Sequence, residues 1–347
     1  MNNRRSSIRR LRFHGLLALS LVLAANPSLA SPLLELGAAA AFNGIVLGDM
    51  TASNSDVEGR LAVGGNLTLN HYAIGMELSN SHGARDDLIV GGALNFSNGR
   101  VYNGNARSGG AANIDQTVGF YSNDPNQPNG SYIAGNPLNF ASLGAALKQQ
   151  SLAWSLISAN GVTSIEYNNI RLTGANSGLN VFHLSGDMLS VATSFWLDIP
   201  EDASAIVNIS GQTIAMHDFA FFRTINNNRQ QLPDNQPGVF RQDGRLTRNI
   251  MLNLFQSTAL DLHAIGIKGN LLAPYADTNF YNGHIDGNLM VASLSSPEGQ
   301  FTGQINYYPV GGVDTVPFLP LLMQLALLAI LAAYLAGPAR TAQADSV

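Results

Sequence analysis

Apolar and polar residues alternate in short stretches along most of the chain, which is the pattern of half-buried β-strands. In the clearest example, residues 267–273 (IKGNLLA) are followed 18 residues later by residues 285–291 (IDGNLMV). Turn-forming residues, including Pro274, Asp277 and the Asn282–Gly283 pair, separate the two copies. Strand, turn and strand at a fixed short spacing predict one coil of a β-solenoid.

The same pattern occurs near the N-terminus. Residues 57–63 (VEGRLAV) have the layout of residues 285–291, and residues 88–96 (LIVGGALNF) repeat it 27 residues later. Because each coil buries its apolar faces by stacking on its neighbours, we expect a continuous right-handed β-solenoid from about residue 37 to residue 308. An asparagine beside each glycine is expected to adopt a left-handed turn conformation and to hydrogen-bond to its counterpart one coil away.

One segment departs from the alternation. Apolar residues at helical spacing predict a long α-helix over residues 139–159, capped by Asn136 or Asn139 and ended at Asn160–Gly161. The predicted apolar face consists of Leu143, Ala146, Leu147, Ala153, Trp154 and Ile157. Lys148, Ser151 and Ser155 fall on the opposite face. Since a helix cannot enter a stack of coils, we expect it to pack alongside the solenoid.

The N-terminal residues have the three regions of a secretory signal peptide. Five arginines among the first twelve residues precede an apolar stretch at residues 16–25, and Ser28-Leu29-Ala30 supplies small residues for signal peptidase. The apolar stretch is short for a retained membrane anchor. The sequence therefore predicts a signal peptide over residues 1–30, with cleavage between Ala30 and Ser31.

The C-terminal residues have the pattern of a membrane anchor. Residues 316–336 contain no charge, and at ~1.5 Å per residue they are long enough to cross a ~30 Å hydrocarbon core. Arg340 follows in a short tail, residues 337–347, and is predicted on the cytoplasmic side. Residues 311–315 form the predicted linker to the domain of residues 31–310.

Composition narrows the function classes. The net charge is −5, and it becomes −10 without the arginines of the signal peptide, so an acidic mature protein argues against a nucleic-acid partner. There are no cysteines, which excludes disulfides and thiolate chemistry. An exported protein without disulfides must gain its stability from a repetitive apolar core.

Several motifs together resemble the choice-of-anchor A family. They are residues 42–50 (FNGIVLGDM), 55–65 (SDVEGRLAVGG), 269–274 (GNLLAP) and 282–287 (NGHIDG), and the resemblance covers about residues 36–308. It implies a bacterial surface protein with an adhesive domain, a C-terminal anchor and no catalytic residues. Val316–Pro317 before the predicted membrane helix resembles a tail read by a sorting protease. The Leu-Pro-x-Thr-Gly cell-wall signal is not in the sequence, which favours a Gram-negative envelope.

The sequence offers little catalytic or metal-binding chemistry. The histidines form no His-Glu-x-x-His pair, so no metal ligands are predicted. His183, Ser185 and Asp187 stand at alternate positions on one predicted strand and its turn, but a solvated strand face explains them better than a triad, because no nucleophile elbow accompanies them. The remaining candidates are the carboxylates Asp56, Glu58, Asp86, Asp87, Asp277 and Asp286. They leave a structural calcium ion and a polysaccharide-active enzyme as alternatives.

The sequence thus predicts an exported, membrane-anchored, non-catalytic adhesion domain without a cofactor. Its expected partners are an extracellular glycan, a matrix protein or further copies of itself, contacted in part by Tyr72, Tyr102, Tyr121 and Tyr281. Ice binding is the alternative, because some ice-binding proteins are solenoids flanked by one long helix. Thr-x-Thr rows, which that class often presents, do not occur in the sequence.

Overall fold

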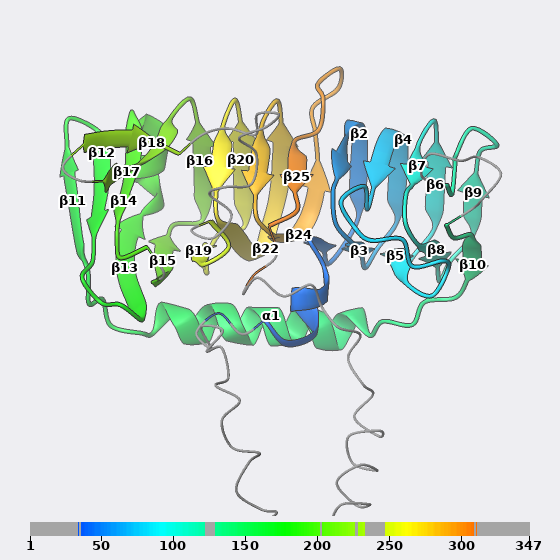
Figure 1. The fold of residues 1–347 in the computed structure, drawn as a ribbon, viewed down its shortest axis with the longest axis horizontal. Helices are drawn as coiled ribbons and strands as arrows, with labels where there is room; N and C mark the ends of the chain where they lie inside the picture. The colour runs from blue at the N-terminus through cyan, green and yellow to red at the C-terminus, as the bar shows by residue number, and fades with distance from the viewer. Residues whose placement is uncertain are drawn as a thin grey trace, which may run out of the picture.

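The computed structural model describes residues 36–121, 129–201, 203–225, 228–232 and 247–308, together with Leu34 and Val310. Parallel strands stack into a β-solenoid, and one α-helix, α1 (Phe140–Ser155), lies along its side (Figure 1). Each complete coil has three segments, such as β5 (Asp86–Val90), β6 (Leu94–Ser97) and β7 (Arg100–Val101). The predicted parallel β-solenoid with a flanking helix is confirmed.

The segments form three sides. The helix-covered side contains β1 (Gly44–Val46), β3 (Leu61–Val63), β5, β8 (Asn105–Ser108), β10 (Tyr132–Ala134), β13 (Leu179–Ser185), β15 (Ser204–Ser210), β19 (Ile250–Asn253) and the first halves of β22 (Asn270–Tyr281) and β24 (Leu289–Ser295). The second side, called the polar face below, contains β2 (Met50–Val57), β4 (Leu67–Ile74), β6, β9 (Ala112–Ile114), β16 (Thr213–His217), β20 (Ala259–His263) and the second halves of β22 and β24.

The third side contains β7, β21 (Gly266–Lys268), β23 (His284–Asp286) and β25 (Gln304–Asn306). A separate five-stranded sheet lies at one end of the solenoid: β11 (Val162–Glu166), β12 (Asn169–Thr173), β14 (Ser194–Asp198), β17 (Ala220–Ile225) and β18 (Asn228–Gln231). Two short 3₁₀ helices, η1 (Gly37–Ala41) and η2 (Gly186–Val191), complete the described elements.

The coils do not follow one another along the axis in sequence order. The chain enters the stack at its middle with β1 and coils to one end at β10, and α1 then carries it to the other end (Figure 1). From β13 it coils back until β24 pairs with β1, Gly44 opposite Leu289. We call this junction of the first and last coils the seam. The expected continuous stack is therefore confirmed, but it is completed by residues more than 240 apart in sequence.

Asparagine side chains form hydrogen bonds between neighbouring coils at the seam. The Nδ2 group of Asn43 donates to the carbonyls of Gly287 (2.9 Å) and Asn306 (3.1 Å), and its Oδ1 accepts from the Gly59 amide. One coil away, Asn270 Oδ1 accepts from the Asn288 amide at 2.9 Å. The expected asparagine ladder is thus present. The left-handed conformation, however, belongs to Gly269 (φ 142°) rather than to its asparagine neighbour.

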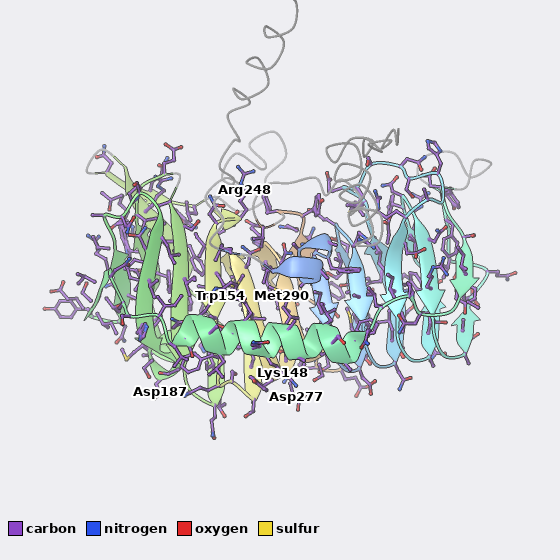
Figure 2. The ribbon with its side chains drawn as sticks, turned by 90° about the horizontal axis from the view of Figure 1, so that it is seen from below. Lys148, Trp154, Asp187, Arg248, Asp277 and Met290 are labelled. Atoms are coloured by element: carbon purple, nitrogen blue, oxygen red, sulfur yellow. The ribbon has the colours of Figure 1, made fainter. Side chains whose placement is uncertain are left out.

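The strands that lie directly beneath α1 are apolar on both faces because both faces are covered. Ile45, Ala62 and Met290 point outward from the solenoid, yet they are buried in a cluster with Leu143, Leu147 and Trp154 of α1. Figure 2 shows α1 crossing the middle of this side of the solenoid. The helix therefore seals the outer apolar row of the solenoid, as predicted.

The helix itself differs from the prediction in two respects. It starts as expected, with Asn139 Oδ1 accepting from the Ser142 amide at 3.0 Å, but it ends at Ser155 rather than near residue 159. Ala146, Ala153 and Ile157 are exposed, whereas Ser151 is fully buried. The buried stripe is narrow because the helix rests on a single row of strands. Ser151 is accommodated because its hydroxyl donates to Asn253 Oδ1 at 2.6 Å.

Candidate functional site

The polar face is a side of the solenoid that α1 leaves uncovered (Figure 1). Along its strands, buried apolar residues alternate with exposed polar ones; in β4, Leu67 and Leu69 point inward while Thr68 and Asn70 point to solvent. The in-register pairing of parallel strands lines these outward residues up from coil to coil. One outward row runs across eight coils: Ala215, Asp261, Asn279, Ser295, Thr51, Thr68, Asn95 and Asn113.

Hydrogen bonds between neighbouring coils hold these side chains in place. Ser293 donates to Asp277 at 2.7 Å and Ser295 to Asn279 at 3.1 Å. In the N-terminal half, Asn70 Oδ1 accepts from Ser97 at 3.2 Å and from Asn98 at 3.0 Å. The face is therefore preorganised, since ligand binding would not have to order side chains that already fix one another.

A line of left-handed residues forms one edge of the polar face. In the N-terminal half these residues are Asn54, His71 and Asn98, with φ between 49° and 53°. In the C-terminal half they are Asp218, Ala264 and Asn282, with φ between 49° and 57°. Each left-handed residue turns the chain from the polar face onto the third side, so the corner is repeated from coil to coil.

Aromatic rings line this edge in the C-terminal half. His217, His263 and Tyr281 occupy the same position in three successive coils. Their rings stack, with centroids 4.7 Å apart between the histidines and 4.9 Å apart between His263 and Tyr281. Sequence inspection missed this ladder because 46 residues separate the two histidines, and the insertion between β16 and β20 hides their equivalence.

The tyrosines proposed as surface contacts do not act as a group. Tyr72 is only 2% exposed and lies in the solenoid core, so its assignment to the surface was wrong. Tyr102 and Tyr121 both pack against the guanidinium of Arg100, at 4.6 and 4.3 Å. Of the four, Tyr281 alone joins the ring ladder beside the polar face.

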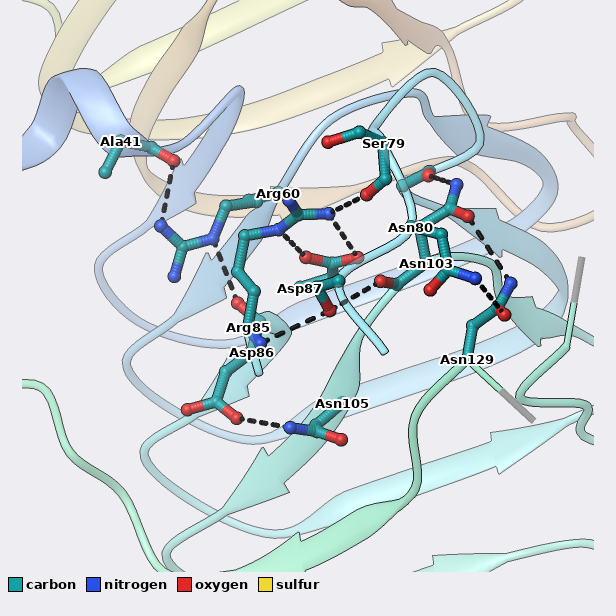
Figure 3. Close-up of polar contacts among 12 residues, drawn as sticks. Ala41, Arg60, Ser79, Asn80, Arg85, Asp86, Asp87, Asn103, Asn105 and Asn129 are labelled. Carbon is teal, nitrogen blue, oxygen red and sulfur yellow. Dashed lines mark hydrogen bonds and ion pairs between the residues drawn. The ribbon is translucent and has the colours of Figure 1, made fainter. Parts of the chain in front are cut away.

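The six candidate carboxylates do not come together as one cation site. Asp87 is buried and contacts Arg85 at 2.6 Å (Figure 3). Asp86 contacts Arg107 at 2.7 Å. Burial raises the pKa of Asp87, although Arg85 acts in the opposite direction. Asp286 forms a buried ion pair of 2.6 Å with Lys268. Protein cations thus balance these three carboxylates.

The other three carboxylates lie elsewhere. Asp277 belongs to the polar face, where it accepts the Ser293 hydroxyl hydrogen bond. Asp56 and Glu58 lie near the seam, at the end of β2. Burial and the nearby charge of Glu58 raise the pKa of Asp56 to about 7. The two groups are therefore better explained as a buried carboxyl pair of the scaffold than as an acid and base in a cleft.

The His183–Ser185–Asp187 arrangement is not assembled as a triad. His183 and Ser185 share the outward side of β13, but Asp187 lies in η2. His183 Nε2 lies 2.9 Å from the carbonyl oxygen of Ile157 and thus binds the backbone just beyond α1. Among the described residues, no hydrogen bond or ion pair joins the three, which agrees with the solvated strand face expected from the sequence.

A family model described as "Putative Ice-binding-like adhesive domain" matches residues 35–303. The chain belongs to this family. The match spans the solenoid and its helix, and domains of this kind are typical of extracellular or cell-surface proteins. No curated protein matches the chain.

Several solved structures are similar at low sequence identity. An ice-binding protein from the Antarctic ascomycete Antarctomyces psychrotrophicus is 10% identical with a TM-score of 0.37, covering 78% of this chain and 97% of that one. An ice-binding protein from an Antarctic Flavobacteriaceae bacterium is 10% identical with a TM-score of 0.32, covering 76% of each chain. A Shewanella frigidimarina ice-binding protein domain is 12% identical with a TM-score of 0.31, covering 79% of this chain and 98% of that one. At such TM-scores these likenesses add nothing to the assignment of a ligand.

The predicted export and anchoring residues lie outside the described part of the chain. They are Ala30 and Ser31 at the signal-peptidase site, and Val316, Pro317 and Arg340 at the anchor. Within the described residues, no helix is long and apolar enough to span a membrane.

Proposed function

We propose that the domain is a non-catalytic adhesion module whose polar face binds an extended, hydroxyl-rich surface, with an extracellular glycan as its ligand. The observation that carries the proposal is the outward row across eight coils, which apart from Ala215 consists of small hydroxyl, amide and carboxylate side chains. Protein–protein interfaces usually depend on large aromatic or arginine anchors. Because that row contains none, a repetitive polar polymer fits it better than a matrix protein or a second copy of the chain.

A tethered module of this kind gains attachment from many weak contacts. Display of many copies on one cell turns modest single-site affinities into firm adhesion.

As in the choice-of-anchor A proteins that the motifs resemble, we propose that the signal peptide directs export of the protein and is then cleaved after Ala30. Residues 316–336 would then retain it at the cell surface unless a sorting protease removes them. N-terminal sequencing of the envelope form should give Ser31 as its first residue, and a protein starting at Met1 would contradict export.

Bulky residues on the polar face should abolish binding. The double variant Thr51→Tyr/Thr68→Tyr places two phenol rings on adjacent coils, where both threonines are exposed and paired. The rings would hold an extended ligand off the face, so affinity in a glycan-binding assay should fall by about tenfold or more, which corresponds to about 1.4 kcal/mol. Cells displaying the variant should adhere correspondingly less.

The matched control is Gln149→Tyr, which adds the same ring to the exposed side of α1. It should leave glycan binding and adhesion unchanged. If the control and the double variant lose glycan binding equally, or if the double variant binds fully, the polar face is not the binding surface. Release of reducing ends from a bound glycan would show that the domain is an enzyme instead.

Ice binding is the second candidate function, because the matching family model is described as ice-binding-like and because Thr51 and Thr68 stand side by side on the polar face. Measurements on ice and on glycans distinguish these two candidate functions. Thermal hysteresis or inhibition of ice recrystallisation by the purified protein, lost in the double variant and kept in Gln149→Tyr, would favour ice as the ligand. Glycan binding at 25 °C without either effect on ice would favour adhesion.

A further inference from the structure

A cluster of metal-ligating side chains lies at the corner of the polar face in its C-terminal half. His217 ends β16, His263 ends β20, and the two residues are direct neighbours in the parallel pairing. Asp218 follows His217 in a left-handed conformation, φ 57°, which directs its carboxylate back toward the imidazole. One ligand atom from each of these residues lies within 4.8 Å of the other two.

The distances suit one small ion after a modest adjustment. Asp218 Oδ2 is 3.0 Å from His217 Nδ1, close to the separation of about 3.4 Å between two ligands bound tetrahedrally at ~2.1 Å. The histidine rings are stacked at an angle of 12°, so they must rotate about their Cβ–Cγ bonds to aim at a common point. Their side chains are 30% and 26% exposed, which leaves room for that rotation.

Two buried polar atoms next to the cluster lack hydrogen-bond partners, which also favours a metal site. Neither Nδ1 of His263 nor Oδ1 of Asp261 has a hydrogen-bond partner, although both atoms are buried. Asp261 Oδ2 lies 3.4 Å from that same His263 nitrogen. A metal-binding histidine commonly donates its other ring N–H to a carboxylate, which fixes the orientation of the ring. Because Asp261 lies beside Nδ1 of His263, it could accept that hydrogen bond and leave Nε2 of His263 as the nitrogen that binds the ion.

We propose that His217, Asp218 and His263 bind one divalent transition-metal ion, such as Zn²⁺ or Ni²⁺, with Asp261 orienting His263. Two imidazoles and one carboxylate form a ligand set that suits these ions and not Ca²⁺ or Mg²⁺, which prefer oxygen ligands alone. The Asp218 side chain is 71% exposed, so solvent can fill the remaining coordination positions. The site is independent of the glycan and ice proposals.

Titration calorimetry of the chelator-treated, purified protein with Zn²⁺ tests the site. One ion should bind per chain, and His217→Gln, His263→Gln and Asp218→Asn should each weaken binding by more than about tenfold. Excess Ca²⁺ or Mg²⁺ should not compete. His71→Asn, at the equivalent corner of the N-terminal half, and Tyr281→Phe, in the same ring ladder, should bind Zn²⁺ as the parent protein does.

A second measurement uses the parent protein alone, so it does not require any variant to fold. In the parent protein, Zn²⁺ should shift the ring-nitrogen NMR signals of His217 and His263 and leave those of His82 and His183 in place. The proposal is overturned if the parent protein binds no Zn²⁺. It is equally overturned if the three ligand variants bind Zn²⁺ as tightly as the parent, or if the shifted signals belong to other histidines. A ladder with only a packing role would give one of these results.

Discussion

Replacing Trp154 with alanine should lower the free energy of unfolding by about 3–5 kcal/mol, the usual cost of removing a large buried aromatic side chain. Trp154 is 4% exposed and packs with Ile206, Met251 and other outward residues of the helix-covered side. Its loss leaves a cavity beneath the last turn of α1. The same change weakens the packing of α1 on the outward apolar residues of the helix-covered side. Exposure of those residues should also make the variant aggregate.

Urea unfolding followed by circular dichroism measures the change in stability, and Leu152→Ala is the matched control. Leu152 lies on the same helix but is 55% exposed, so its truncation should change stability by no more than about 0.5 kcal/mol. Equal effects of the two substitutions would mean that α1 does not hold the solenoid together through its buried stripe.

The repeats allowed a good prediction of the stacking because equivalent residues of successive coils pair directly. Ile267 and Ile285, matched in the sequence by their 18-residue spacing, are partners in the structure. The same spacing aligns Lys268 with Asp286, and these two form a buried ion pair. Opposite charges at equivalent repeat positions were thus a usable signal for that contact.

Tyr72 shows why alternation alone misplaced some residues. Counting from Leu67, strict alternation would put position 72 outside the core. His71, however, is left-handed with φ 51°, and this corner shifts the alternation by one residue and turns Tyr72 inward. A non-glycine left-handed residue has no distinctive sequence signal, so the shift could not be read from the pattern. The Tyr167–Asn168 turn of the hairpin between β11 and β12, with φ of 48° and 63°, is a second place where non-glycine residues are left-handed.

Long-range contacts account for the other differences. Ser151 looked like a surface residue because its partner, Asn253, lies 102 residues away. The position of β1 in the middle of the stack also rests on contacts between distant residues, such as Asn43 with Gly287. Repeats define which residues are equivalent, but they do not define the order in which coils are stacked. For the same reason, the histidines of the ring ladder could be matched only once their strands were seen to pair.

Asp56→Asn should stabilise the protein at pH 8 by up to about 4 kcal/mol and have little effect at pH 4. Burial, reinforced by Glu58, raises the pKa of Asp56 from 3.8 to about 7, and one of its carboxylate oxygens is buried without a hydrogen-bond partner. The folded protein therefore holds this proton more tightly than the unfolded chain does. Stability from this group is fully present below about pH 4 and is lost as the pH rises to about 7, by about 1.4 kcal/mol per pH unit. Asparagine has nearly the same shape but no charge to bury, so the variant escapes that loss.

Urea unfolding of both proteins at pH 4, 6 and 8 measures the difference, which should grow with pH and level off above pH 7. Asp115→Asn is the control of opposite sign. Hydrogen bonds from Thr117 lower the pKa of the exposed Asp115, so its substitution should cost a little stability near neutral pH and nothing well below pH 4. A constant difference between Asp56→Asn and the parent across this range would mean that Asp56 is ionised in the folded protein at low pH. The seam would then tolerate a charge that burial beside Glu58 should exclude.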